Sequence, residues 1–448
     1  MEFNYKDYQK GFNLPTTFGI YSSLDKVQYN KLNDEYDKNG KIIDRTFNEL
    51  KKRTTTDYFN KVYKAQTEAL TYSKKIFPTY KFIMPDVLTD DWMSTVDWHK
   101  QHPTRDHSLH QILTAYIVSR LLGGGDSTLS LKLNGQNGIS LLDYCTDQIL
   151  YSPRMNYLRN YYNDLEPGFL DNANNELKRM WVQDVFYETA IISALFHDMG
   201  YPWQYINRLA MGVDAADYNN ILNLNSYSNS IMEMIKERLI IYPFLGYIEN
   251  NLKHSTGILN KYVQNLINRG LKETHGFPGA IGFMCLNDQV RNYSKYGQLN
   301  DNTFRFIMDW AAVGIMMHDM VGLYWDDKET KTPQNPILRL SFETDPLSSL
   351  IALADVLEEF QRPYAVFNQA SNNIEQVIVN YKFPCIETKL EIKGRTLYIT
   401  YYYDSKISVN ENENRRKKEI WAYFNPDNGF IDVKGLGITA ISCNVRIK

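Results

Sequence analysis

The middle of the chain contains a succession of apolar segments with helical spacing, most of them closed by a residue that ends helices. They run over 109–122 before three glycines, 181–199 before Gly200, 228–241, 304–320, and 347–361 before Pro363. This succession predicts that residues 92–373 form a mainly α domain.

The two flanking regions have different patterns. Residues 1–91 mix charged and aromatic residues, and the helical spacing over 46–75 predicts a helical N-terminal extension. After Asn373, β-branched and aromatic residues at short spacing predict strands over 376–381, 388–392, 395–403, 418–424 and 438–447. The polar stretch 410–418 is expected to be an exposed hairpin loop. Residues 374–448 are therefore predicted to form a small β-rich C-terminal domain.

Composition excludes several classes of protein. The 49 Lys and Arg nearly balance the 52 Asp and Glu, which argues against nucleic acid or a membrane surface as the main partner. The N-terminus lacks the apolar core of a signal peptide, and no apolar run approaches the roughly 20 residues of a membrane span, so a cytoplasmic protein is expected. The 4 cysteines form no Cys-x-x-Cys pair, so we expect buried thiols. The 33 tyrosines suit half-buried surface or homo-oligomer contacts.

An adjacent His197 and Asp198 follow the apolar stretch Ile-Ile-Ser-Ala-Leu-Phe. Imidazole and carboxylate both lose hydration when packed against apolar side chains, and a bound cation satisfies both groups at once. Such a doublet also occurs as a hydrogen-bonded pair or at a helix end. Further ligands are therefore needed before it indicates a metal site.

Three other histidines and one carboxylate lie in similar surroundings. His110 falls along the edge of the buried stripe of its segment, His318 ends an apolar run, and His275 opens a short segment. Asp355 interrupts Leu-Ile-Ala-Leu-Ala, where a lone buried carboxylate is costly. Each of these residues alone is explained as a buried side chain whose polar atoms are hydrogen-bonded. Together with the doublet, they indicate a shared metal centre.

The order of these residues resembles the HD superfamily of metal-dependent phosphohydrolases. Its pattern is a His, a His-Asp doublet and a later Asp on separate helices of an all-α domain. The resemblance covers about residues 92–367 and includes Arg105-Asp106-His107 before His110, and Met-Gly-Tyr-Pro after the doublet. It implies an HD-type helical domain.

The resemblance also implies roles for the site residues. His110, His197, Asp198 and Asp355 would hold one ion, His275 and His318 the other, and Asp198 would bridge the two. Such ligands suit Mn, Fe, Co, Ni or Zn, and two divalent transition-metal ions roughly 3.5 to 4 Å apart activate water for attack on phosphorus. Besides Asp198, the catalytic candidates are Arg105, whose guanidinium matches phosphate oxygens, and His107, as a phosphate contact or a partner of the ligands.

Two rival assignments remain open at this point. His318 is followed by Asp319, which forms a second doublet; the order of motifs favours His197-Asp198 as the bridging pair and makes Asp319 a supporting or helix-end residue. His107 lies three residues before His110, so both side chains could share a helix face. The family pattern selects His110.

The chain departs from two better-known branches of the superfamily. Signalling phosphodiesterases of the HD-GYP type carry a Lys after the Gly of the doublet motif and a Glu after the paired His; here Tyr201 follows Gly200, and Gly276 follows His275. Deoxynucleotide triphosphohydrolases place a further catalytic His shortly after the doublet, and none occurs between residues 199 and 253. These departures leave the substrate undetermined.

We therefore expect a metal-dependent hydrolase of a phosphate ester or anhydride, with a small phosphorylated molecule, a nucleotide, as substrate. One alternative is a deoxynucleoside triphosphate triphosphohydrolase. The other is a nucleotide-binding regulatory module that retains the metal site without turnover.

Overall fold

The computed structural model describes most of the region that contains the doublet and its proposed partners. The described residues are 1–4, 107–133, 138–168, 170, 175–198, 200, 269–270, 273–293, 302–324, 338–360, 364–367, 377–380, 385–403 and 406–448. The helices expected over 46–75 and 228–241, and the candidate Arg105, lie outside them. The helix α8 begins at His107, but the surroundings of the His107 side chain lie outside the described part.

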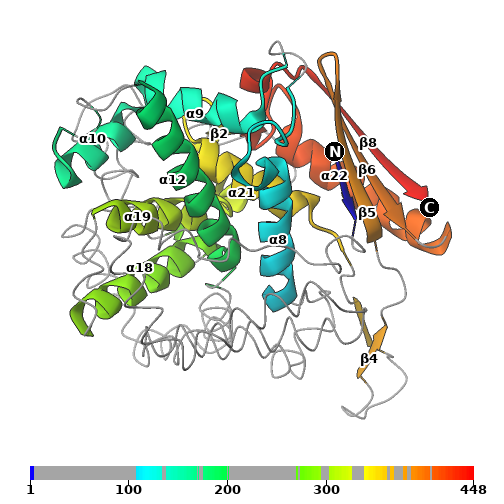
Figure 1. The fold of residues 1–448 in the computed structure, drawn as a ribbon. Coiled ribbons are helices and arrows are strands. Elements are labelled where there is room, and N and C mark those ends of the chain that lie inside the picture. The colour runs from blue at the N-terminus through cyan, green and yellow to red at the C-terminus, as the bar shows by residue number, and fades with distance from the viewer. Residues whose placement is uncertain are drawn as a thin grey trace, which may run out of the picture.

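The described part is mainly helical, with a small sheet near the C-terminus (Figure 1). The α-helices are α8 (His107–Leu121), α9 (Leu141–Tyr151), α10 (Asn156–Leu165), α12 (Asn175–Phe196), α18 (Gly276–Tyr293), α19 (Asn302–Met317), α20 (Val321–Tyr324), α21 (Pro346–Leu357) and α22 (Lys406–Phe424). The short 3-10 helices are η2 (Gly123–Gly125), η4 (Pro153–Met155) and η6 (Lys434–Leu436).

α12 is the central helix of the bundle. Every residue from Val185 to Ala194 is buried, so the helix is covered on all sides rather than along one stripe. It packs against α8, α19 and α21, and α8 and α19 in turn contact α21. The expected helices over 109–122, 181–199, 304–320 and 347–361 are confirmed as α8, α12, α19 and α21, with ends displaced by a few residues.

The sheet combines strands from both ends of the chain. Its order is β1-β5-β6-β8, from β1 (Glu2–Asn4), β5 (Cys385–Lys393), β6 (Thr396–Tyr403) and β8 (Ala440–Ile447). β5 and β6 form a hairpin whose turn includes Gly394 at φ +59°, a conformation that favours glycine. The smaller pairs are β2 (Leu340–Ser341) with β7 (Ile431–Asp432), and β3 (Tyr364–Phe367) with β4 (Val377–Asn380). The strands expected over 376–381, 388–392, 395–403 and 438–447 are confirmed.

The expectations for 410–418 and 418–424 were wrong, because both segments belong to the helix α22. β6 and β8 are parallel neighbours, and a parallel pair needs a long crossover connection, which α22 provides. The buried face of α22 carries Asn412, Arg416, Ile420 and Phe424, spaced four residues apart. Two of these four side chains are polar, so a search for apolar residues at helical spacing does not detect the helix.

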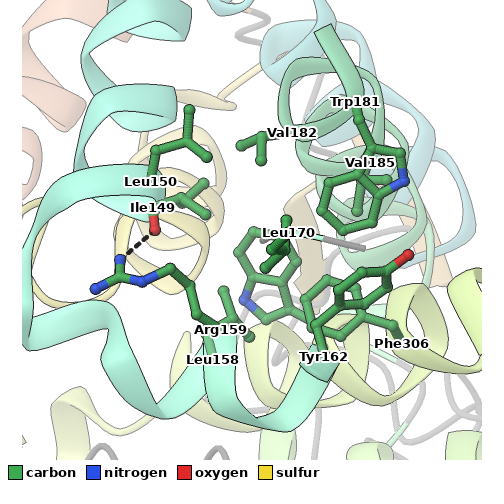
Figure 2. A pocket seen from close by; sticks show the side chains of 11 residues that line it. Ile149, Leu150, Leu158, Arg159, Tyr162, Leu170, Trp181, Val182, Val185 and Phe306 are labelled. Atoms are coloured by element: carbon green, nitrogen blue, oxygen red, sulfur yellow. Dashed lines mark hydrogen bonds between the residues drawn. The ribbon is translucent and has the colours of Figure 1, made fainter. Parts of the chain in front are cut away.

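An aromatic cluster closes the bundle where α10, α12 and α19 meet. Tyr162 packs against Trp181 with ring centroids 4.3 Å apart and against Phe306 at 5.0 Å. A cavity beside this cluster is lined almost wholly by apolar side chains (Figure 2). Its one charged side chain, Arg159, donates to the Ile149 carbonyl, so the cavity belongs to the core packing. None of the described helices combines the length and apolarity that a membrane span requires.

Candidate metal centre

The proposed ligands lie at the ends of helices that meet beside α12. α12 ends at Phe196, so His197 and Asp198 follow directly in a turn, and His318 likewise follows the last residue of α19. His275 immediately precedes α18, whereas His110 and Asp355 lie within α8 and α21. Because α8, α12, α19 and α21 pack together, residues more than 240 positions apart in sequence come into contact.

Two glycines allow the backbones around the doublet to approach closely. A Cβ on Gly200 would lie 1.8 Å from the His275 carbonyl oxygen and 2.6 Å from the Gly279 nitrogen. A Cβ on Gly276 would lie 2.6 Å from the Ile315 carbonyl oxygen. Any larger side chain would therefore force His275 away from the doublet and from the end of α19.

The first half of the centre gathers around His110. Its Nε2 lies 2.8 Å from Oδ1 of Asp355, 3.2 Å from Nε2 of His197 and 3.7 Å from Oδ2 of Asp198. These side chains are almost fully buried, and Asp355 is the most exposed at 13%. Ligand atoms of His110, His197 and Asp198 all lie within 4.8 Å of one another, and Asp355 contacts the same His110 nitrogen.

The second half gathers around His275. Its Nε2 lies 3.1 Å from Nε2 of His318 and 3.0 Å from Oδ1 of Asp198. Oδ2 of Asp198 approaches His110, and Oδ1 lies 3.3 Å from Nε2 of His197 as well as 3.0 Å from His275, so the carboxylate borders both halves. This is the arrangement that a bridging carboxylate requires.

The outer nitrogens of all four rings have hydrogen-bond acceptors. Nδ1 of His197 donates to the Ala194 carbonyl at 2.8 Å, and Nδ1 of His318 donates to the Ile315 carbonyl at 2.7 Å. A carbonyl oxygen can only accept, so in the neutral rings the proton is on Nδ1 and the lone pair of Nε2 is directed toward the centre.

Carboxylates take the same role for the other two rings. Nδ1 of His110 donates to Oε2 of Glu358 at 2.5 Å, and Nδ1 of His275 lies 2.7 Å from Oδ2 of Asp319. The same Asp319 oxygen accepts the backbone N–H of His275 at 2.8 Å. Carbonyl or carboxylate partners of this kind orient metal-ligating histidines and fix their tautomer.

Two of the histidines strongly resist protonation. Burial lowers the pKa of His197 to about 3, and burial together with the charge of His275 lowers the pKa of His318. Neutral imidazole is the form that binds metal ions. Both rings are therefore held in the ligand form at neutral pH.

The surroundings of the other two histidines favour the protonated ring in the absence of a metal. Burial works against the charged form of His275, but Asp319 and Asp198 outweigh it and raise its pKa to about 10. The pKa of His110 is raised in the same way, because its hydrogen bonds to carboxylates outweigh burial. The Nε2 proton of each of these rings then faces a carboxylate oxygen, Oδ1 of Asp355 or of Asp198, as well as Nε2 of the partner ring. A metal ion would have to displace this proton.

The chemistry of this donor set fits two divalent cations. Four neutral imidazoles would place their Nε2 lone pairs face to face in two pairs, 3.2 Å apart in His110–His197 and 3.1 Å apart in His275–His318, which is repulsive unless a cation or proton lies between them. The four nearby carboxylates, those of Asp198, Asp355, Glu358 and Asp319, carry four negative charges when ionised. Two divalent ions would balance that charge, which is costly to bury alone.

The structure thus brings together all six residues expected as ligands: His110, His197, Asp198, His275, His318 and Asp355. Of the two doublets, His197-Asp198 places its carboxylate between the halves, whereas Asp319 contacts the outer nitrogen of His275. Sequence reasoning missed Glu358. Its only signal was a glutamate next to the end of an apolar helix.

Comparisons with known proteins add no family assignment. The chain matches no protein-family model, no curated protein is similar to it, and no solved structure matches it. The placement of the His and Asp side chains therefore carries the argument for function.

Proposed function

We propose that this protein is a metal-dependent phosphohydrolase of the HD type, with a binuclear His/Asp site. The observation that carries the proposal is the position of Asp198, whose carboxylate lies near His110 and His197 in one half and near His275 in the other. A shared carboxylate with two or three further ligands on each side is suited to a pair of ions. Bound divalent ions would supply Lewis-acid activation of water and of a phosphoryl oxygen.

The residues of the chain have two tasks in this reaction. His197 and His318, which are buried and neutral, keep their Nε2 lone pairs aimed at the centre without competition from protons. Glu358 and Asp319 hold the partner rings in the matching orientation. The proposal also has Arg105 and His107 contact a phosphate oxygen of the substrate.

The proposal is tested first by metal content. Elemental analysis of the purified protein is expected to find up to two transition-metal ions per chain, and His197→Ala and Asp198→Asn are expected to lose metal and activity together. Asp309→Asn is the matched control: it neutralises a largely buried carboxylate of α19 that accepts from the Tyr161 hydroxyl. Unchanged metal content in both site variants would remove the basis of the proposal.

The substrate is tested with a panel of phosphorylated nucleotides. Cyclic dinucleotides, dinucleoside polyphosphates, nucleoside monophosphates and deoxynucleoside triphosphates are incubated with metal-loaded protein, and released phosphate, triphosphate and nucleoside are measured. Release of triphosphate alone would identify the deoxynucleoside triphosphate triphosphohydrolase alternative. Tight nucleotide binding without any product would support a regulatory module instead.

A further inference from the structure

The segment that follows α21 connects the candidate metal centre to the C-terminal sheet and α22. Glu358 and Glu359 are adjacent, and both are buried, yet their carboxylates face different parts of the molecule. Glu358 accepts from Nδ1 of His110, whereas Glu359 accepts from Arg415 and from Nη1 of Arg416 on α22. A displacement of one glutamate would therefore move the other.

The carboxyl end of α21 is capped by side chains from the C-terminal region. The last carbonyls of a helix have no partner within the helix. Here the Val356 carbonyl accepts from the Tyr401 hydroxyl at 3.1 Å and from Nη2 of Arg416, and the Leu357 carbonyl accepts from the Thr388 hydroxyl at 3.3 Å. These contacts fix the helix turn that carries Asp355.

Arg416 is the residue on which these contacts converge. It is fully buried, and its guanidinium stacks over the Tyr401 ring, 4.3 Å from the centroid. Nη1 donates to Glu359 at 3.1 Å and to Glu419 at 2.6 Å, while Nη2 donates to the Val356 carbonyl and the Tyr401 hydroxyl. A planar guanidinium can join a carboxylate to a helix end in this way, whereas an ammonium group lacks the fork.

We infer that Arg416 is a positioning residue for the metal centre and that the C-terminal sheet with α22 serves to hold one half of that centre in place. Arg416 acts through Val356 and Glu359, which flank the segment containing Glu358. The inference rests on the metal centre of the proposed function. It assigns a task to the C-terminal region that the sequence left open.

Among the described residues, the hydrogen bonds of this connection reach the centre at His110, although Asp355 also lies close to His197 and His318. Asp355 and Glu358 both contact His110, the ligand of the first half. His275 and His318 are oriented by Asp319 and by a carbonyl of α19. Loss of Arg416 should therefore weaken chiefly the ion held by His110, a selectivity that general destabilisation would not produce.

The test is a Co²⁺ titration of the full chain, followed by visible absorption. The double variant Arg416→Met with Glu359→Met removes both buried charges together, which avoids leaving an unpaired buried ion. We expect this variant to bind one ion as the unaltered protein does and the other at least about tenfold more weakly, the size of effect typical for partners of metal ligands. Asp319→Asn should weaken the opposite ion, and the combined variant should weaken both.

The control is Arg179→Met, which removes another arginine that joins two helices through Asp143 and Asp147. It lies about 27 Å before the doublet along α12, at roughly 1.5 Å per residue, and both ions should bind it normally. If the double variant does not fold, Arg416→Lys takes its place and is expected to show the same selective loss, smaller in size.

The outcomes distinguish failure of the inference about Arg416 from failure of the proposed metal centre. If the unaltered protein binds no Co²⁺, the proposed metal centre fails, and the inference fails with it. If the unaltered protein binds two ions and a folded Arg416 variant also binds both within about twofold, or weakens both equally, the inference is overturned while the proposed function stands.

Discussion

Glu358→Gln tests how the first half of the metal centre is held. The Glu358 carboxylate accepts two hydrogen bonds, from Nδ1 of His110 at 2.5 Å and from the backbone N–H of Phe360 at 2.7 Å. A glutamine of nearly the same size supplies only one acceptor, so one of these two buried donors loses its partner. An unsatisfied buried donor costs about 1 to 3 kcal/mol, and the metal-free variant should be less stable by about that amount.

The His110 ring offers the variant a second response. If the amide NH₂ faces Nδ1, the ring can accept there by moving its proton to Nε2, which removes the lone pair from the centre. Either response weakens the ion held by His110. We expect a loss of about 10- to 100-fold in affinity, equivalent to roughly 1.4 to 2.7 kcal/mol.

The assay is the Co²⁺ titration, with thermal unfolding of the metal-free protein recorded in parallel. Glu343→Gln is the control, because this exposed carboxylate pairs with Arg154 at the surface, where such pairs contribute little. A folded Glu358→Gln protein that binds both ions like the unaltered chain would refute the reasoning about His110.

Three further predictions concern pH, packing and thiols. The pKa of His275 is raised to about 10, above its ordinary 6.5, so its stabilisation of the metal-free protein is full below about pH 6.5 and disappears as the pH rises through 10. The difference in unfolding free energy between the unaltered protein and His275→Gln should shrink between about pH 6.5 and pH 10. A constant difference would contradict this prediction. Gly200→Ala should destabilise the protein by about 1 to 3 kcal/mol and reduce bound metal, whereas Gly322→Ala, whose Cβ meets nothing within 4 Å, should do neither. Burial raises the pKa of Cys385 to about 12 and that of Cys145 further, so mass spectrometry should find neither thiol alkylated before unfolding.

The helices of the bundle could be predicted because their signals are local. The three glycines that follow α8 and the apolar runs of α12, α19 and α21 are visible in short windows of sequence. The same signals failed for α22. Its buried face includes Arg416, whose cost of burial is met by Glu359 and the end of α21, more than 50 residues earlier in the chain.

The six candidate ligands could likewise be named in advance, because imidazole and carboxylate groups in apolar surroundings are unusual wherever they occur. Of the groups that orient them, Asp319 was expected as a supporting or helix-end residue from its place after His318. Glu358 looks like an ordinary acidic residue next to a helix end, and two of the four rings are oriented by backbone carbonyls, which leave no trace in residue type.

The sequence by itself determined the helical segments, most strands of the small sheet and the residue types from which a metal site could be built, because these depend on spacing and composition along short stretches. Only the tertiary structure decided that Asp198 rather than Asp319 lies between the two halves, since both doublets have the same local pattern. It also decided that the C-terminal region caps the helix carrying Asp355. That contact depends on Arg416 of α22 reaching the Val356 carbonyl of α21, and an approach of distant segments is not encoded in any one of them.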